Sequence, residues 1–220
     1  MIGIVIPVHN EEEDLEACIQ ALQKSIQEIV HLNIPVQTLF VLDNCIDESY
    51  NIIVNQNQNY IQCAFESVGK ARHLGVQELI HLGATWIAST DADSTVHHDW
   101  LYHQIQHQPT DVICGVVEIK DWRNLSSISR KKYTDHYQDR MGHQHIHGAN
   151  LSFSREAYLA VGGFDPITCH EDVKLVEKFK KHNYSITWSN QVRVTTSSRL
   201  NARAPNGFST FLTTINTEQS

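Results

Sequence analysis

The sequence has no long apolar run, no paired cysteines and no cluster of basic residues. No apolar segment approaches the ~20 residues that a membrane-spanning helix requires. The five cysteines form no Cys-x-x-Cys pair, and an odd number without regular spacing is typical of reduced thiols in a cytoplasmic protein. The net charge is −8 at pH 7, which argues against nucleic-acid binding. We expect a cytoplasmic protein with no transmembrane segment and no nucleic-acid partner, at most peripheral to a membrane.

Two glycine-rich nucleotide-binding motifs are also missing. The sequence contains neither G-x-G-x-x-G nor G-x-x-x-x-G-K-[ST], which excludes a dinucleotide oxidoreductase and a P-loop NTPase. The first strand is predicted to begin at Ile2, which leaves no room for the charged and apolar regions of a signal peptide. Any nucleotide chemistry must therefore depend on other residues.

What is present is the composition of an ordinary globular domain. Apolar residues make up 41% of the 220 positions and charged residues 19%, and a chain of this length buries roughly 70% of its unfolded surface. We expect one domain that covers residues 1–220. It is divided into a nucleotide-binding half (1–95), an acceptor-side half (96–195) and a flexible tail (196–220).

Strands and helices alternate through about the first hundred residues. The apolar run 2–8 predicts a strand buried on both faces, and apolar residues at spacings of three and four predict a helix from Leu15, capped by Asn10. Alternation of this kind indicates βαβ units and a parallel sheet. The remaining predicted elements of this half are strands Val36–Asp43, Ile61–Glu66 and Trp86–Asp91 and helix Gly69–Leu82.

The alternation breaks in the second half. After a strand at Val112–Lys120, the polar, His-rich segment 121–145 predicts a helix and a loop. The elements expected further on are a strand at Gly148–Phe153, a helix at Arg155–Val161, a turn at Gly162 and Gly163, a helix at Glu171–His182 and a strand at Tyr184–Val194.

Acidic residues lie at the carboxyl ends of two predicted strands and at the start of a late helix. They are Asp43, the pair Asp91 and Asp93, and the pair Glu171 and Asp172. Parallel strands end at one edge of an open α/β sheet, where ligands bind. Alternate residues of an extended segment point the same way, so Asp91 and Asp93 can both reach one Mg²⁺ or Mn²⁺ ion. In the alternative, Asp93 only caps a helix near His97.

At this point the chain resembles the family 2 glycosyltransferases of the GT-A fold, over nearly its whole length. Six segments resemble motifs of that family and occur in the family's order. They are Ile4–Glu11 with its P-x-x-N-E pattern, Val41–Asp47, Gly69–Arg72, Thr90–Ser94, Gly148–Asn150 together with Val161–Asp165, and His170–Asp172.

The resemblance implies an α/β fold with one Rossmann-like, mostly parallel sheet, helices on both faces and a smaller acceptor-side lobe. It implies an inverting enzyme that moves a sugar from a nucleotide-diphosphate sugar, with UDP-sugar as the default donor. The acceptor is a hydroxyl of a glycan, a lipid-linked or a small molecule. Asp93, helped by Asp91, would bind Mn²⁺ or Mg²⁺, and Asp172, next to Glu171, would act as general base. The candidate donor-binding residues are Pro7, Asn10, Glu11, Asp43, Lys70, Arg72, Asp91, Ala92, Arg199 and Arg203.

Simpler interpretations of these residues remain open. Asp43 could cap the turn that follows it, Glu171 and Asp172 could be first-turn residues that favour the helix dipole, and Lys70 and Arg72 could form a solvated helix face. The sequence also departs from the family pattern, because Leu42-Asp43-Asn44 stands where many relatives have two aspartates. One carboxylate is thus left for the base, and the identity of the nucleotide stays open.

Three further features lie outside these motifs. Arg199 and Arg203 occur in a Ser- and Asn-rich tail and could close over the diphosphate. The run from His143 to His147 places alternate histidines on one face, as surface residues or acceptor contacts rather than as a zinc site. His170 could contact the acceptor or the metal.

Two other functional classes compete with the transferase. A sugar-1-phosphate nucleotidyltransferase would ordinarily have a glycine-rich loop after the first strand, where this chain has Pro7 to Glu11. A non-catalytic nucleotide-sugar-binding module would bind the donor without releasing nucleoside diphosphate.

Overall fold

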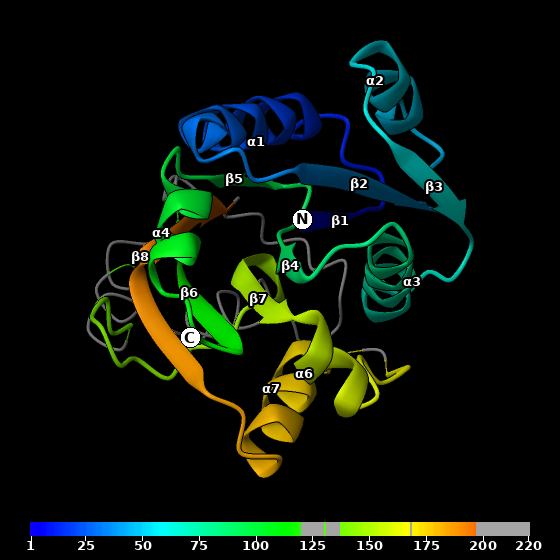
Figure 1. Cartoon of the computed structure of the whole chain (residues 1–220). Coiled ribbons are helices and arrows are strands. Elements are labelled where there is room, and N and C mark those ends of the chain that lie inside the picture. Colours follow the sequence, from blue (N-terminus) through cyan, green and yellow to red (C-terminus); the bar gives the residue numbers. More distant parts are fainter. Residues whose placement is uncertain (120–129, 131–136, 168, 197–220) are drawn as a thin grey trace.

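The computed structural model describes residues 1–119, 130, 137–167 and 169–196. One sheet of eight strands runs through the molecule in the order β3-β2-β1-β4-β7-β6-β8-β5 (Figure 1). β7 and β5 are antiparallel to their neighbours, and the other pairings are parallel. The strands are β1 (Ile2–Val8), β2 (Val36–Asp43), β3 (Tyr60–Cys63), β4 (Trp86–Ser89), β5 (Ser94–Val96), β6 (Val112–Ile119), β7 (Leu151–Ser154) and β8 (Ile186–Thr196).

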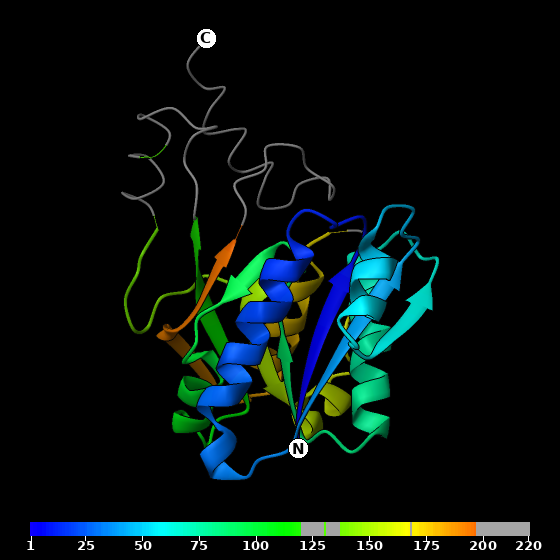
Figure 2. The same ribbon diagram turned by 90° about the horizontal axis from the view of Figure 1, so that it is seen from above.

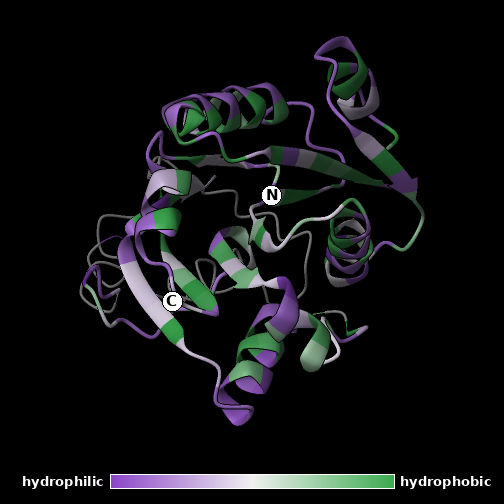
Figure 3. Ribbon diagram, viewed as in Figure 1, coloured by the Kyte–Doolittle hydropathy of each residue, from purple (hydrophilic) through white to green (hydrophobic). Residues whose placement is uncertain are grey.

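Helices cover both faces of the sheet. One apolar cluster joins the sheet to α1, α2 and α4, and a second joins it to α3, α6 and α7. Figure 3 shows the apolar residues of these helices facing inward. The helices are α1 (Leu15–Glu28), α2 (Ser49–Asn55), α3 (Val68–His81), α4 (Trp100–Gln106), α6 (Arg155–Ala160) and α7 (Glu171–Lys181), with short 3₁₀ turns η1 (Val30–Leu32) and η2 (Gly148–Asn150).

The two-sided burial explains the apolar run of β1. All seven residues of this strand are buried. Ile4 and Ile6 belong to the cluster under α1, whereas Val5 belongs to the cluster under α3, as the alternation of side chains along a strand requires. A central parallel strand with helices on both sides has no polar face, so its sequence cannot alternate.

Several candidate site residues lie at one edge of this sheet. In Figure 2, β1 and β2 run away from the amino terminus toward the same edge. β4 is parallel to β1 and therefore ends there too. The residues at the ends of β2 and β4, which include Asp43, Asp91 and Asp93, thus lie at the carboxyl edge of the sheet.

Asn150 closes the sheet where β6 is irregular. The pairing of β6 with β8 shifts register between Gly115 and Val116. The Asn150 amide Nδ2 donates to the carbonyl oxygens of Val116 (2.8 Å) and Val192 (2.9 Å), and its Oδ1 accepts from the Trp100 indole (2.9 Å). A side chain on Gly115 would collide with Asn150, so a glycine is required here.

The predicted α/β fold with a mostly parallel sheet is confirmed, and the bounds of β1 and β2 are those expected. Two elements were missed, α2 and β5. The predicted cap of α1 is wrong, because Asn10 Oδ1 accepts from the Ile46 amide (2.8 Å) and α1 begins after Asp14. Asp93 is not a helix cap either, since it precedes β5 and α4 begins only at Trp100.

Some predictions are not tested by the structure. Most of segment 121–145 and the tail beyond Thr196 lie outside the described residues, and the division into two halves stays a prediction. No helix within the described ranges is long and apolar enough to cross a bilayer.

Candidate active site

A buried arginine connects the two pairs of carboxylates that the sequence singled out. Arg72 lies in the first turns of α3, and 2% of it is exposed. Its Nη2 lies 2.7 Å from Asp91 Oδ1, and its Nη1 forms an ion pair with Glu171 Oε1. The end of β4 and the start of α7 are therefore joined through one guanidinium. An arginine can do this because its planar fork offers donors in two directions.

The surroundings of Arg72 are shaped to admit its guanidinium. A Cβ on Gly148 would lie 2.8 Å from Arg72 Nη1, and a Cβ on Gly69 would lie 3.0 Å from Glu171 Cγ. On another side, the guanidinium lies over the Phe164 ring, 5.7 Å from its centroid, which is a cation–π distance. Two glycines and one aromatic ring from separate parts of the chain thus leave room for this ion pair.

We predict that Gly148→Ala lowers both stability and activity. The added methyl group meets the Arg72 side chain, which is enclosed and cannot move away, so the overpacking costs about 1–3 kcal/mol. Chemical denaturation measures this cost. Ala149→Ser, one residue on, is the control, and an unchanged denaturation midpoint for Gly148→Ala would contradict the prediction.

Asp172 is held by backbone N–H groups at the start of α7. Its Oδ2 accepts from the Gly148 amide (2.7 Å) and its Oδ1 from the Val173 amide (2.7 Å). Burial raises the pKa of Asp172, and the negative charge of Glu171 raises it further, while Arg72 opposes both effects. A carboxylate with a raised pKa is a better proton acceptor than an ordinary aspartate, because a general base works best with a pKa near the working pH.

Asp91 and Asp93 follow β4 directly. About a third of the Asp91 side chain (33%) is exposed, and desolvation of the remainder raises the pKa of Asp91 to about 6. The Arg72 charge opposes this shift and the Asp93 charge adds to it. Ser94 Oγ lies 3.1 Å from Asp93 Oδ1 and 3.0 Å from Thr196 Oγ1, so the end of β8 lies beside this pair.

The carboxylates of Asp91 and Asp93 suit a hard divalent cation whose remaining coordination positions are filled by another ligand. Asp91 and Asp93 are close enough to repel each other, and oxygen donors are what Mg²⁺ and Mn²⁺ prefer. Among the described residues there is no group of three His, Cys, Asp or Glu side chains that could hold a metal by itself. Phosphate oxygens and water would have to supply the remaining ligands, as is usual for Mg²⁺.

Asp43 anchors the loop between β3 and α3. Its Oδ1 accepts from the amides of Phe65 (2.6 Å) and Glu66 (3.0 Å), and its Oδ2 accepts from the amide of Ser67 (2.9 Å). The side chain is almost fully buried, with 3% exposed. It therefore does not cap the turn that follows it in sequence. A carboxylate has about four lone-pair sites, so three of them are already used by this loop.

The other predicted donor-binding residues are placed as follows. Pro7 is buried within β1, Ala92 is buried between the two aspartates, and the backbone N–H of Glu11 donates to Ser49 Oγ (2.8 Å). Lys70 is exposed on α3, as a solvated helix face requires, whereas Arg72 on the same helix is not. Arg199 and Arg203 lie outside the described residues.

The histidine run belongs to a stack of aromatic and imidazole rings in the segment before Gly148. His145 stacks on Tyr137 with 4.1 Å between ring centroids, and His147 and His143 lie next to this pair. Desolvation lowers the pKa of His147 to about 3, so its imidazole is neutral at pH 7. Neutral stacked rings favour packing or contact with an acceptor over an acid–base role. His170, in the left-handed region (φ 60°), is exposed just before α7.

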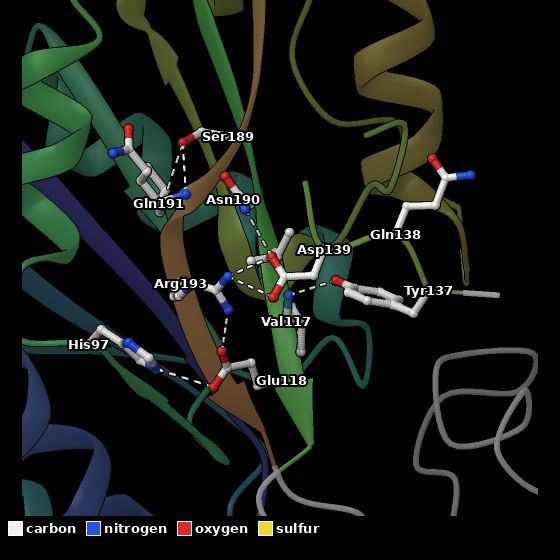
Figure 4. Close-up of polar contacts among 12 residues, drawn as sticks. His97, Val117, Glu118, Tyr137, Gln138, Asp139, Ser189, Asn190, Gln191 and Arg193 are labelled. Carbon is white, nitrogen blue, oxygen red and sulfur yellow. Dashed lines mark hydrogen bonds and ion pairs between the residues drawn. The ribbon is translucent and has the colours of Figure 1, made fainter. Parts of the chain in front are cut away.

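A polar network lies next to these rings (Figure 4). Arg193 on β8 pairs with Glu118 on β6 and with Asp139, whose Oδ2 lies 2.7 Å from Nη2. His97 Nε2 lies 3.5 Å from the second oxygen of Glu118. The Tyr137 hydroxyl accepts from the Val117 amide (2.7 Å). This network ties the segment that leads to Gly148 onto the sheet.

Sequence reasoning singled out the segments Gly148–Asn150 and Val161–Asp165 but did not predict their contacts with the site, and it missed the Asp139–Arg193 pair. The contacts are Gly148 as the packing partner of Arg72, Phe164 beneath the guanidinium and Asn150 at the bulge. A single sequence carries no pattern for such contacts, because each one joins residues that are far apart in the chain.

Comparison with solved structures identifies the fold. TarS from S. aureus, in complex with UDP-GlcNAc, superposes with a TM-score of 0.69 and 13% identity over 94% of this chain and 61% of that chain. The mannosyltransferase PcManGT from Pyrobaculum calidifontis, with GDP-Man and Mn²⁺, gives 0.66 and 15% over 92% of this chain and 58% of that chain. Glucosyl-3-phosphoglycerate synthase from Mycobacterium tuberculosis, with Mn²⁺, UDP and phosphoglyceric acid, gives 0.61 and 16% over 90% and 71%.

At these low identities the likeness shows the fold alone, and that fold is the GT-A fold of glycosyltransferases. The chain spans 61% of the TarS chain and 58% of PcManGT. The sequence profile of glycosyl transferase family 2 matches residues 3–160. The chain belongs to this family of enzymes. Comparison with curated protein sequences gives no significant match.

Proposed function

We propose that the protein transfers a sugar from a nucleotide-diphosphate sugar to an acceptor hydroxyl, with inversion at the anomeric carbon. In this proposal Asp93 and Asp91 hold Mn²⁺ or Mg²⁺ at the donor diphosphate, and Asp172 is the general base. UDP-sugar is the default donor. TarS and the mycobacterial synthase were solved with UDP-GlcNAc and UDP, whereas PcManGT was solved with GDP-Man, so the base stays a proposal.

One observation carries the proposal. The ion pairs of Arg72 join Asp91 to Glu171, the neighbour of Asp172, so both pairs of carboxylates belong to one connected cluster at the carboxyl edge. Transfer with inversion needs two acidic groups on opposite sides of one sugar, one near the leaving diphosphate and one near the incoming hydroxyl. If Asp93 and Asp172 faced separate surfaces, one could not act near the leaving diphosphate while the other acts near the incoming hydroxyl of the same sugar.

The chemistry follows from these positions. A divalent cation, when bound, neutralises the charge that develops on the departing diphosphate. Asp93 and Asp91 would hold and orient it there. Asp172 would take the proton from the acceptor hydroxyl as its oxygen attacks the anomeric carbon from the opposite face. The Gly148 amide fixes the Asp172 carboxylate in place during this step.

Release of nucleoside diphosphate tests the proposal directly. Donors with UDP, GDP and other bases are incubated with the protein and Mn²⁺, with and without candidate acceptors, and the released diphosphate is measured. We expect slow release with water and faster release with an acceptor for one donor. Donor binding without release under any condition would favour a binding module instead.

We predict that Asp93→Asn weakens the dependence of activity on low concentrations of metal, so that more Mn²⁺ is needed. The neutral amide is a poorer ligand for a hard cation, so we expect the Mn²⁺ concentration for half-maximal donor turnover to rise at least about tenfold. Addition of EDTA to the unchanged protein should stop turnover, and Mn²⁺ should restore it. Asp99→Asn is the matched control, because Asp99 pairs with His103 and not with the site. Equal Mn²⁺ requirements in the two variants would contradict the role of Asp93.

A further inference from the structure

A cavity of about 550 Å³ lies at the opposite edge of the sheet from the active site. Its lining includes Ile2 and Trp86, the first residues of β1 and β4, and Ser154, the last residue of the antiparallel β7. β1 has seven residues, which at ~3.3 Å per residue puts the cavity on the order of 20 Å from the carboxyl edge. Its volume is within the range of small-molecule sites.

The cavity contains a buried polar group with unused hydrogen-bonding capacity. Gln104 on α4 is 1% exposed, and its Oε1 accepts from the Trp86 indole N–H (3.0 Å). This bond fixes the orientation of the amide. In the part of the chain that the structure describes, Nε2 of Gln104 has no hydrogen-bond partner. A buried donor without a partner costs free energy, which a ligand oxygen would recover after a small opening of the cavity wall, since Nε2 is closed to solvent in the structure.

The charges of the lining restrict the ligand. Carboxylates of Asp111 and Glu156 lie in the wall together with the hydroxyl residues Thr85 and Ser185. Among the described residues, no Lys, Arg or His side chain lines the cavity, and the Met1 amino group is the cation in its wall. The two carboxylates outweigh this amino group, which disfavours an anion such as a second nucleotide. Carboxylates, an amide and hydroxyls beside an indole suit a neutral molecule with many hydroxyl groups and an apolar C–H face.

We infer that this cavity binds a neutral saccharide, as the remote part of a glycan acceptor or product. The choice of a glycan rests on the proposed transfer of sugar to a hydroxyl. Gln104 Nε2 would donate to a sugar oxygen, the carboxylates of Asp111 and Glu156 would accept from sugar hydroxyls, and Trp86 would contribute apolar contact. A glycan held here would be anchored by a segment that does not react.

The test is a titration of the ¹⁵N-labelled protein, without donor or metal, with maltotriose, tri-N-acetylchitotriose and mannotriose. The observed signals are the side-chain amide of Gln104 and the indole N–H of Trp86. We expect one saccharide to shift both signals, and UDP to shift neither. No shift with any of these saccharides, or a shift with the cation spermidine alone, would overturn the inference.

Variants sharpen the test. Gln104→Leu should weaken saccharide binding about tenfold through the loss of one hydrogen bond. Gln106→Leu, the same change on the exposed side of α4, should have no effect. Because Gln104→Leu also leaves the Trp86 indole without its acceptor, Glu156→Ala at an exposed position serves as a second variant that should weaken binding. Equal affinities for all three variants and the unchanged protein would refute the site.

The outcome is independent of the proposed reaction. If saccharide shifts the Gln104 signal but no donor is turned over, the transferase proposal is wrong and the saccharide site in the cavity is supported. If donor is turned over and the Gln104 signal never moves, the transferase stands and the cavity site is wrong.

Discussion

Replacement of Asp172 by asparagine is expected to lower kcat by about 10²–10⁴-fold and to leave donor binding unchanged. The amide keeps the shape of the carboxylate but cannot take a proton from the acceptor hydroxyl, and one general base contributes about this factor. Steady-state kinetics with acceptor measures kcat, and titration with the nucleoside diphosphate and Mn²⁺ measures donor affinity.

Two measurements separate this role from a structural one. Glu177→Gln on the same helix is the control, since Glu177 is exposed and pairs only with Lys174 among the contacts that the structure records. The pH profile is the second measurement. Because burial raises the pKa of Asp172, activity should fall as the pH drops through a pKa higher than that of an ordinary aspartate. Full activity of Asp172→Asn, or an unchanged acid limb, would remove Asp172 from the mechanism.

The second large effect is expected from Arg72→Met. Methionine fills part of the space but leaves Glu171, with 5% exposed, as a buried charge without its partner. Loss of one partner from a buried ion pair costs about 3–5 kcal/mol. For a chain of this size the melting temperature should fall by roughly 10 °C. Differential scanning calorimetry measures the change, and Lys70→Met, at an exposed position of the same helix, is the control.

A second substitution tests whether the lost stability comes from the uncompensated charge. In the double variant Arg72→Met, Glu171→Gln, the buried negative charge is gone as well, so part of the lost stability should return. Arg72→Lys should recover less than half of the loss, because a single ammonium group cannot pair with Asp91 and Glu171 as a planar fork does. Additive effects of the two substitutions would show that Arg72 and Glu171 do not interact, contrary to their ion pair.

Most of the fold was predictable from the sequence because strands and helices of a two-sided sheet have distinct patterns. The run Ile2–Val8 and the helical spacing after Leu15 depend only on local periodicity, and both predictions are confirmed. The two missed elements are short. β5 has three residues and forms only because β8, about a hundred residues later, pairs with it. No local pattern can report such a pairing.

Most acidic residues of the site were predictable for a similar reason, since Asp43, Asp91 and Asp93 end or follow buried strands, whereas Glu171 and Asp172 open α7. What could not be predicted is what each one contacts. Arg72 was expected to bind the donor, and the structure places its buried guanidinium in two ion pairs, with Asp91 and with Glu171. Asp43 was expected to reach the nucleotide base, and its carboxylate oxygens accept hydrogen bonds from three backbone amides. These contacts depend on how distant segments meet, whereas the donor-binding roles themselves stay predictions.

The order of the strands also bears on how the molecule folds. β1, β2 and β4 pair within the first ninety residues. The sheet is complete only when β4 also pairs with β7 and β6 pairs with β8, and both partners come much later in the chain. Arg72 precedes Glu171 by 99 residues, so their ion pair cannot form before α7 has been synthesised. A nascent chain that ends before α7 therefore has β1, β2 and β4 but not the cluster that joins the two pairs of carboxylates.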